Sequence, residues 1–84
     1  MWREVPVPNA TEIKIEYLNE GTVAVVSLNR AAKFNAITYE MFDNLRIAFE
    51  YLGRNESEVR AIVFTGVGKN FTAGLDLKSA MMMQ

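Results

Sequence analysis

The sequence contains no cysteine and no histidine among its 84 residues. The absence of cysteine excludes disulfide bonds, and the absence of histidine excludes most zinc sites and any nucleophile that a histidine base would activate. A basic excess is also missing, because 9 lysine and arginine residues face 10 acidic residues and the net charge is −1. This balance disfavours nucleic acid and anionic membranes as partners, and the apolar runs are far too short to span a bilayer.

The composition is that of a globular protein, with 50% hydrophobic and 23% charged residues. At this length the chain is at most one small domain, and such a domain buries only about 60% of the surface that its unfolded chain exposes. With no disulfide or visible metal site to stabilise it, a fold made by this segment alone is expected to be marginal.

The N-terminal half predicts an extended arm over residues 1–12 and then a hairpin. Ile13, Ile15 and Tyr17 alternate with charged residues, which is typical of a half-buried strand. The turn-forming residues 19–22 separate this strand from the apolar run 23–28, which predicts a strand covered on both faces.

A helix and a third strand are predicted next. Apolar residues from Met41 to Leu52 follow the spacing of one helix stripe, which includes Phe42, with Thr38 as the N-cap and Gly53 as a left-handed residue that ends the helix. The run 61–65 predicts another apolar strand, parallel to the strand 23–28 through a right-handed βαβ crossover.

The predicted elements do not make a complete fold, because a parallel sheet needs cover on both faces and one helix covers only one. A second helix also begins near residue 75 without a stop signal before residue 84. We therefore expect an α/β architecture in which residues 13–84 form the N-terminal portion of a single longer domain. The three methionines near the end are interpreted as packing residues and not as metal ligands.

Glycines after the last predicted strand raise the question of a phosphate site. A Walker loop fails here, because position 63 is valine and Asn70 follows Lys69. The dinucleotide fingerprint fails as well, because Phe71 stands where a third glycine is needed. A plain turn at the strand exit is the favoured interpretation of Gly66 and Gly68.

The following residues suggest a different site. If a helix begins near residues 74–76, the N–H groups of Ala73, Gly74 and Leu75 lack intrahelical partners and could stabilise a developing enolate. The small residues at 73 and 74 could equally serve only to fit a strand-to-helix corner. The spacing alone leaves both interpretations open.

Two ordered motifs then carry a resemblance. "VAVVSLNRAAKFNAIT" and, one helix later, "VRAIVFTGVGKNFTAGLDL" resemble the N-terminal part of the crotonase superfamily, the enoyl-CoA hydratase/isomerase fold, over roughly residues 13–80. The resemblance implies a ββαβ start of that fold and acyl-CoA chemistry with a two-donor oxyanion hole, as in fatty acid β-oxidation. Ala31 departs from the family, which usually has proline there, and this puts the rigidity of the loop in doubt. Within the superfamily, "NFTAGLDL" looks most like the dienoyl-CoA isomerases.

The same resemblance implies roles for individual residues. The Ala73 backbone N–H matches the first oxyanion donor, and the second donor and the catalytic carboxylates lie outside this segment. The residues matching the family's CoA and substrate contacts are Ala32, Lys33, Phe34, Ala36, Ala73, Gly74, Leu75 and Asp76.

Some of these residues have simpler explanations. An acid such as Asp76 in a first helix turn is favoured by the helix dipole without any chemistry, and Lys69 on a turn is more often solvated. Lys33 beside Phe34 could hold a nucleotide, although a lysine over a buried aromatic ring explains the pair nearly as well.

Two function classes remain: an enzyme that hydrates or isomerises an unsaturated acyl-CoA, or a noncatalytic acyl-CoA-binding or assembly protein with the same fold. No cofactor beyond the CoA of the substrate and no metal is expected. The family implies a homotrimer or homohexamer, in the mitochondrial or peroxisomal matrix of a eukaryote or the cytoplasm of a bacterium.

Overall fold

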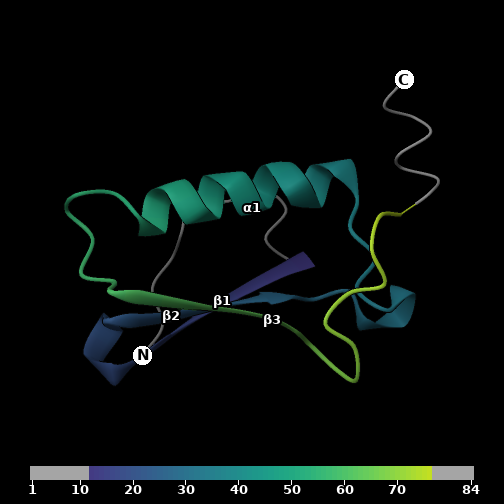
Figure 1. The fold of residues 1–84 in the computed structure, drawn as a ribbon, viewed down its shortest axis with the longest axis horizontal. Helices are drawn as coiled ribbons and strands as arrows, with labels where there is room; N and C mark the ends of the chain where they lie inside the picture. Colours follow the sequence, from purple (N-terminus) through teal and green to yellow (C-terminus); the bar gives the residue numbers. More distant parts are fainter. Residues whose placement is uncertain (1–11, 77–84) are drawn as a thin grey trace.

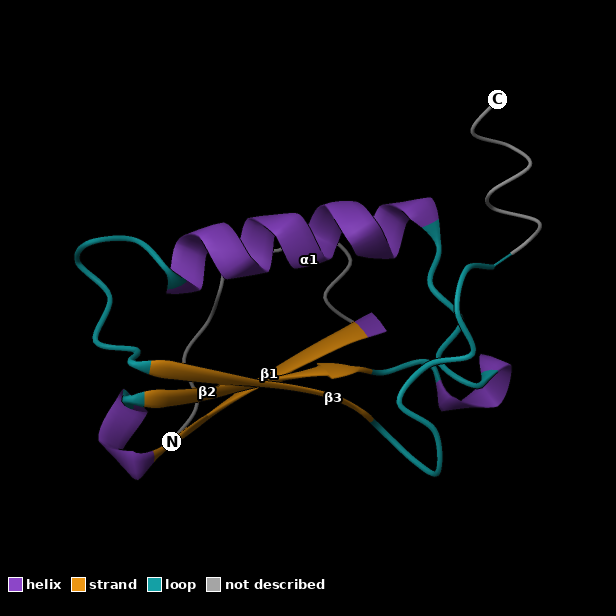
Figure 2. Cartoon of the chain, viewed as in Figure 1, coloured by secondary structure: helices purple, strands orange, loops and turns teal. Residues whose placement is uncertain are grey.

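The computed structural model describes residues 12–76, which form a three-stranded sheet with one long helix across it (Figures 1 and 2). The strand order in the sheet is β1-β2-β3. The elements in chain order are β1 (Ile13–Leu18), the short turn η2 (Asn19–Gly21), β2 (Val23–Leu28), the short turn η3 (Ala31–Lys33), α1 (Tyr39–Leu52) and β3 (Ala61–Gly66).

The hairpin is confirmed, since β1 and β2 pair antiparallel with Ile15 opposite Val26. The turn between them holds Asn19, Glu20 and Gly21 at positive φ, which asparagine and glycine tolerate better than most residues. The Asn19 side chain donates to the Thr22 hydroxyl at 2.7 Å. This turn therefore lies where the sequence places it.

The parallel pairing of β2 and β3 is confirmed as well, with Val26 opposite Phe64. The chain between them passes through α1, which covers one face of the sheet (Figure 1). Both β2 and β3 consequently end at the same edge of the sheet.

Helix α1 begins after Thr38 and ends before Gly53, as the sequence predicts, but the conformation predicted for Gly53 is wrong. The Thr38 hydroxyl accepts a hydrogen bond from the Met41 N–H at 3.1 Å, as an N-cap does. Gly53, predicted to be left-handed, has φ −94° and ψ 3°, a conformation open to any residue. Its N–H donates to the Phe49 carbonyl at 2.9 Å, so the chain leaves the helix without a left-handed step.

The hydrophobic core lies between α1 and the face of β1 and β2 beneath it. Phe42, placed in the predicted stripe, is instead 47% exposed, because it follows Met41 by one residue and so points about 100° away around the helix. The Asn44 side chain is buried in the helix face, and its Nδ2 has no hydrogen-bond partner within the described residues. The buried apolar residues are Ile13, Ile15, Tyr17, Ala24, Val26, Leu28, Met41, Leu45, Ala48 and Leu52.

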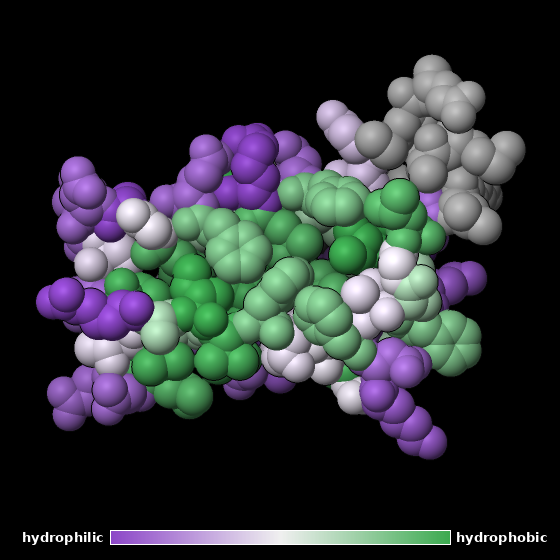
Figure 3. Space-filling model, in the orientation of Figure 1, coloured by the Kyte–Doolittle hydropathy of each residue, from purple (hydrophilic) through white to green (hydrophobic). Residues whose placement is uncertain are grey.

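Strand β3 is apolar yet exposed along its length. Val63 and Phe64 are 48% and 40% exposed, and the space-filling view shows an apolar area beneath α1 (Figure 3). The prediction that one helix cannot cover such a sheet is thus confirmed. The prediction that β2 is buried on both faces is wrong, because Val23 and Val25 are only half-buried.

Two predicted elements fall largely outside the described residues. The N-terminal arm belongs to residues 1–12, of which only Glu12 is described, and the second helix belongs to residues 75–84, of which Leu75 and Asp76 are described. Leu75 forms an isolated parallel bridge with Ile37. No described helix is long and apolar enough to cross a membrane.

Candidate functional site

The candidate site consists of two loops, residues 29–38 after β2 and residues 67–76 after β3. Because the two strands are parallel neighbours, their following loops emerge at the same edge of the sheet and lie side by side (Figure 1). All of the site residues predicted from the sequence belong to these loops, so the structure brings them together.

Backbone hydrogen bonds join the two loops. The Ala73 N–H donates to the Phe34 carbonyl at 2.9 Å, the Ile37 N–H donates to the Gly74 carbonyl at 2.8 Å, and the Asp76 N–H donates to the Ile37 carbonyl at 2.8 Å. The second loop is therefore fixed along residues 34–37 of the first.

The side chain of Asn35, a residue of the loop 32–36 that the resemblance matches to the CoA-contacting loop, lies at the centre of the site and is fully buried. Its Oδ1 accepts from the Arg30 N–H at 2.8 Å, and its Nδ2 donates to the carbonyls of Val67 and Asn70, each at 2.8 Å. Asn35 also adopts φ +56°, a conformation that asparagine tolerates better than most residues. One buried amide thus closes the first loop on itself and holds the start of the second.

The guanidinium of Arg30 forms a second link. Its Nη1 donates to the Asp76 carboxylate and to the Ala36 carbonyl, both at 2.9 Å, and its Nε lies 3.2 Å from the Glu12 carboxylate. Arg30 and Asp76 are 46 positions apart and mostly buried. Asp76 thus has a structural partner that local spacing did not reveal, while the helix turn in which the sequence places it falls largely outside the described residues.

The three candidate donor amides differ in availability. The Ala73 N–H, predicted as the oxyanion donor, already donates to the Phe34 carbonyl, so this assignment disagrees with the structure. The Gly74 N–H donates to the Thr72 hydroxyl at 3.0 Å. The Leu75 N–H has no acceptor among the described residues. In the bridge with Ile37, the Gly74 carbonyl and the Asp76 N–H face Ile37, whereas the N–H and carbonyl of Leu75 face the opposite way.

The loop predicted to contact CoA is open to solvent. Ala32, Lys33 and Phe34 are exposed and Ala36 is half-buried. Phe34 is 63% exposed, so the alternative of a lysine over a buried aromatic ring is wrong. Lys69 is exposed near the tip of the second loop.

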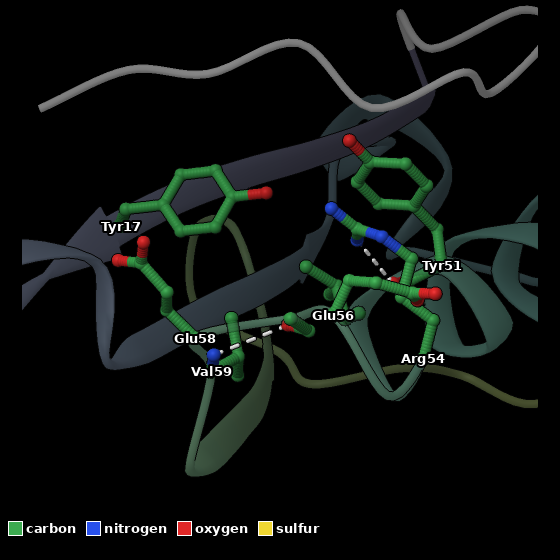
Figure 4. Close-up of a pocket in the computed structure, with 8 residues that line it drawn as sticks. Tyr17, Tyr51, Arg54, Glu56, Glu58 and Val59 are labelled. Atoms are coloured by element: carbon green, nitrogen blue, oxygen red, sulfur yellow. Dashed lines mark hydrogen bonds between the residues drawn. The ribbon is translucent and has the colours of Figure 1, made fainter.

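Other parts of the described chain offer less. No group of three or more acidic, histidine or cysteine residues there could hold a metal. A polar cavity of about 130 Å³ lies away from the two loops, lined by Tyr17 of β1 and by residues at the end of α1 and in the segment that leads to β3 (Figure 4). On its wall, the Arg54 guanidinium stacks at 3.8 Å from the centre of the Tyr51 ring.

Comparison with known proteins identifies the family. The family model for enoyl-CoA hydratase/isomerase matches residues 19–84. The chain belongs to the enoyl-CoA hydratase/isomerase family. It is 36% identical over 72 residues to "Probable enoyl-CoA hydratase 1, peroxisomal" of Arabidopsis thaliana, covering 86% of this chain and 26% of that protein. It is 37% identical over 65 residues to the short-chain-enoyl-CoA hydratase of Clostridium acetobutylicum, covering 76% and 24%.

The fold agrees with this membership. The crystal structure of an enoyl-CoA hydratase from Shewanella pealeana superimposes with a TM-score of 0.76 at 28% identity, covering 88% of this chain and 27% of that one. The chain therefore has the start of the crotonase fold and spans about a quarter of the length of the relatives it matches. None of these three proteins is named as a dienoyl-CoA isomerase, so the comparisons support the family and not that narrower resemblance.

Proposed function

We propose that the full-length protein hydrates or isomerises an unsaturated acyl-CoA thioester in fatty acid β-oxidation, by moving a proton next to the thioester carbonyl. The carboxylates that transfer protons would lie outside these 84 residues. The residues here would supply one oxyanion donor and part of the CoA-binding surface, namely Ala32, Lys33, Phe34, Ala36 and residues 73–76.

The observation that carries the proposal is the Leu75 N–H, which has no acceptor among the described residues and lies in a loop held by hydrogen bonds on its other side. A fixed donor of this kind can stabilise negative charge that develops on a thioester oxygen without reorganising during the reaction. We therefore assign the oxyanion donor to Leu75 in place of Ala73. Gly74 has φ +98° and no described atom within 4 Å of the position that a Cβ would take, which allows a substrate to approach this backbone closely.

The electrostatics of the neighbouring loop suit the rest of the substrate. Lys33 and Lys69 are exposed cations, one in each of the two loops. Phe34, the residue after Lys33, presents an exposed aromatic ring. Phosphates and an adenine ring are groups that lysine and aromatic side chains bind. Coenzyme A would enter as part of the substrate, with no separate cofactor or metal.

An amide-to-ester replacement at residue 75 tests the donor directly. Replacing the Leu75 N–H by an ester oxygen should lower kcat of the full-length protein by about 10²- to 10³-fold, the loss typical of one oxyanion donor. Leu75→Ala, which keeps the N–H, is the matched control and should retain most of kcat. An ester variant as active as the wild type would contradict the assignment.

The assay should follow both hydration of a 2-enoyl-CoA and isomerisation of a 3,5-dienoyl-CoA, since the comparisons do not separate these activities. Binding of acyl-CoA without turnover would favour the noncatalytic alternative. We further propose that the full-length protein assembles as a homotrimer or homohexamer, which light scattering would test. Its compartment would be the mitochondrial or peroxisomal matrix in a eukaryote and the cytoplasm in a bacterium.

A further inference from the structure

The direction of the Leu75 N–H is set by the peptide group that joins it to Gly74. The carbonyl of that peptide group accepts a hydrogen bond from the Ile37 N–H at 2.8 Å. A trans peptide is planar, with its N–H pointing opposite to its C=O. The Leu75 N–H therefore points away from Ile37, and any rotation of this peptide group would turn the donor with it.

The preceding peptide group is held by a side chain. The Gly74 N–H donates to the Thr72 hydroxyl at 3.0 Å, and the same hydroxyl donates to the Asn35 carbonyl at 2.6 Å. Thr72 is half-buried, and 37 positions separate it from Asn35. One hydroxyl thus joins the buried centre of the first loop to the peptide group beside the proposed donor.

Gly74 is the point at which this link matters most. Glycine has wide conformational freedom, and here it is held at φ +98° between the Thr72 bond on its N–H and the Ile37 bond on its carbonyl. Without the bond to its N–H, Gly74 gains rotational freedom, which is then restrained only by the Ala73 bond to the Phe34 carbonyl on one side and the Ile37 bond to its own carbonyl on the other.

We infer that Thr72 is a positioning residue for the Leu75 oxyanion donor. The inference rests on the proposed function and adds a residue that acts through Gly74 without touching the substrate. A misplacement of about 1 Å in a catalytic group lowers turnover about 10²-fold. Because the donor bonds most strongly to the charged transition state, its misalignment should lower kcat and leave KM nearly unchanged.

The test compares Thr72→Val with Thr72→Ser in the full-length protein. Valine has the shape of threonine without the hydroxyl, so kcat should fall about 10- to 100-fold, whereas serine keeps the hydroxyl and should restore most of the activity. Thr65→Val, at an exposed position of β3, is the matched control and should leave kcat unchanged. Melting temperatures of the three variants show whether each is folded.

A spectroscopic readout separates positioning from a structural role. A chromophoric aryl-acryloyl-CoA absorbs at longer wavelength when a hydrogen bond polarises its thioester carbonyl, so binding to the wild type should shift its spectrum to the red. The shift should shrink in Thr72→Val and persist in Thr72→Ser. A full shift and full kcat in folded Thr72→Val would overturn the inference and leave the proposed function standing.

Two further outcomes are decisive. No red shift and no turnover in the wild type would overturn the proposed function together with the inference. If Thr72→Val does not fold, Thr72→Ser still tests the inference, because a folded serine variant that loses the shift would contradict a role for the hydroxyl.

Discussion

Replacing Asn35 by alanine should strongly destabilise the protein. The substitution removes three hydrogen bonds, one from the Arg30 N–H and two to the carbonyls of Val67 and Asn70. At about 1 kcal/mol of net stability for each, the loss is about 3 kcal/mol. Alanine at φ +56° adds about 1 kcal/mol of backbone strain. The free energy of unfolding should therefore fall by about 4 kcal/mol.

The assay is urea unfolding of the full-length protein, followed by circular dichroism at one fixed protein concentration. Asn35→Gly loses the same three bonds without the left-handed strain, so it should lose about 3 kcal/mol, and the difference from alanine isolates the backbone term. Asn55→Ala, at an exposed position, is the control and should change the free energy by less than about 0.5 kcal/mol. A loss below about 1 kcal/mol for Asn35→Ala would refute the reasoning.

Three further predictions concern stability. Gly66→Ala should lower the free energy of unfolding by about 2 kcal/mol or more, because the alanine Cβ would lie 2.3 Å from the Phe71 carbonyl oxygen and 2.6 Å from that of Asn70. An unchanged melting temperature would show that the loop after β3 shifts freely. Thr38→Ala should cost about 1 kcal/mol by loss of the N-cap, with Thr38→Ser near wild type in the same assay. Asn44→Leu should be neutral or stabilising, since it removes a buried amide whose Nδ2 has no partner among the described residues. A fall of more than about 1 kcal/mol in the free energy of unfolding would point to a partner for that amide.

The local elements could be predicted from the sequence because their signals are local. Alternation in β1, the helical stripe of α1 and the hydroxyl of Thr38 each act within a few residues, and the structure agrees with them apart from Phe42, which lies off the buried stripe. The prediction of a left-handed Gly53 was wrong because glycine permits a left-handed helix end without requiring it. Burial of β2 on both faces was overestimated because an apolar run indicates what a strand can bury and not what lies against it.

The site was only partly predictable, for a physical reason. The motifs located both loops, but the choice among Ala73, Gly74 and Leu75 depends on which N–H already has an acceptor. The acceptor of Ala73 is a carbonyl of the other loop, and the acceptor of Gly74 is the Thr72 hydroxyl, which is itself held by the other loop. The roles of Arg30 and Asn35 are likewise defined by partners far away in sequence. Polar residues of the loop motif that have no evident local role, such as Arg30 and Asn35, are the signal that could have indicated such long-range hydrogen bonds.

The parallel pairing of β2 with β3 also has a kinetic consequence. The β1–β2 hairpin and α1 form from contacts close in sequence, which are made in microseconds, whereas β2 and β3 meet only after a much longer loop has closed. The hydroxyl bond of Thr72 to Asn35 spans 37 positions and belongs to that same closure. The two loops of the candidate site are thus expected to assemble late, in one step with the sheet, so substitutions at Thr72 should accelerate unfolding more than they slow folding.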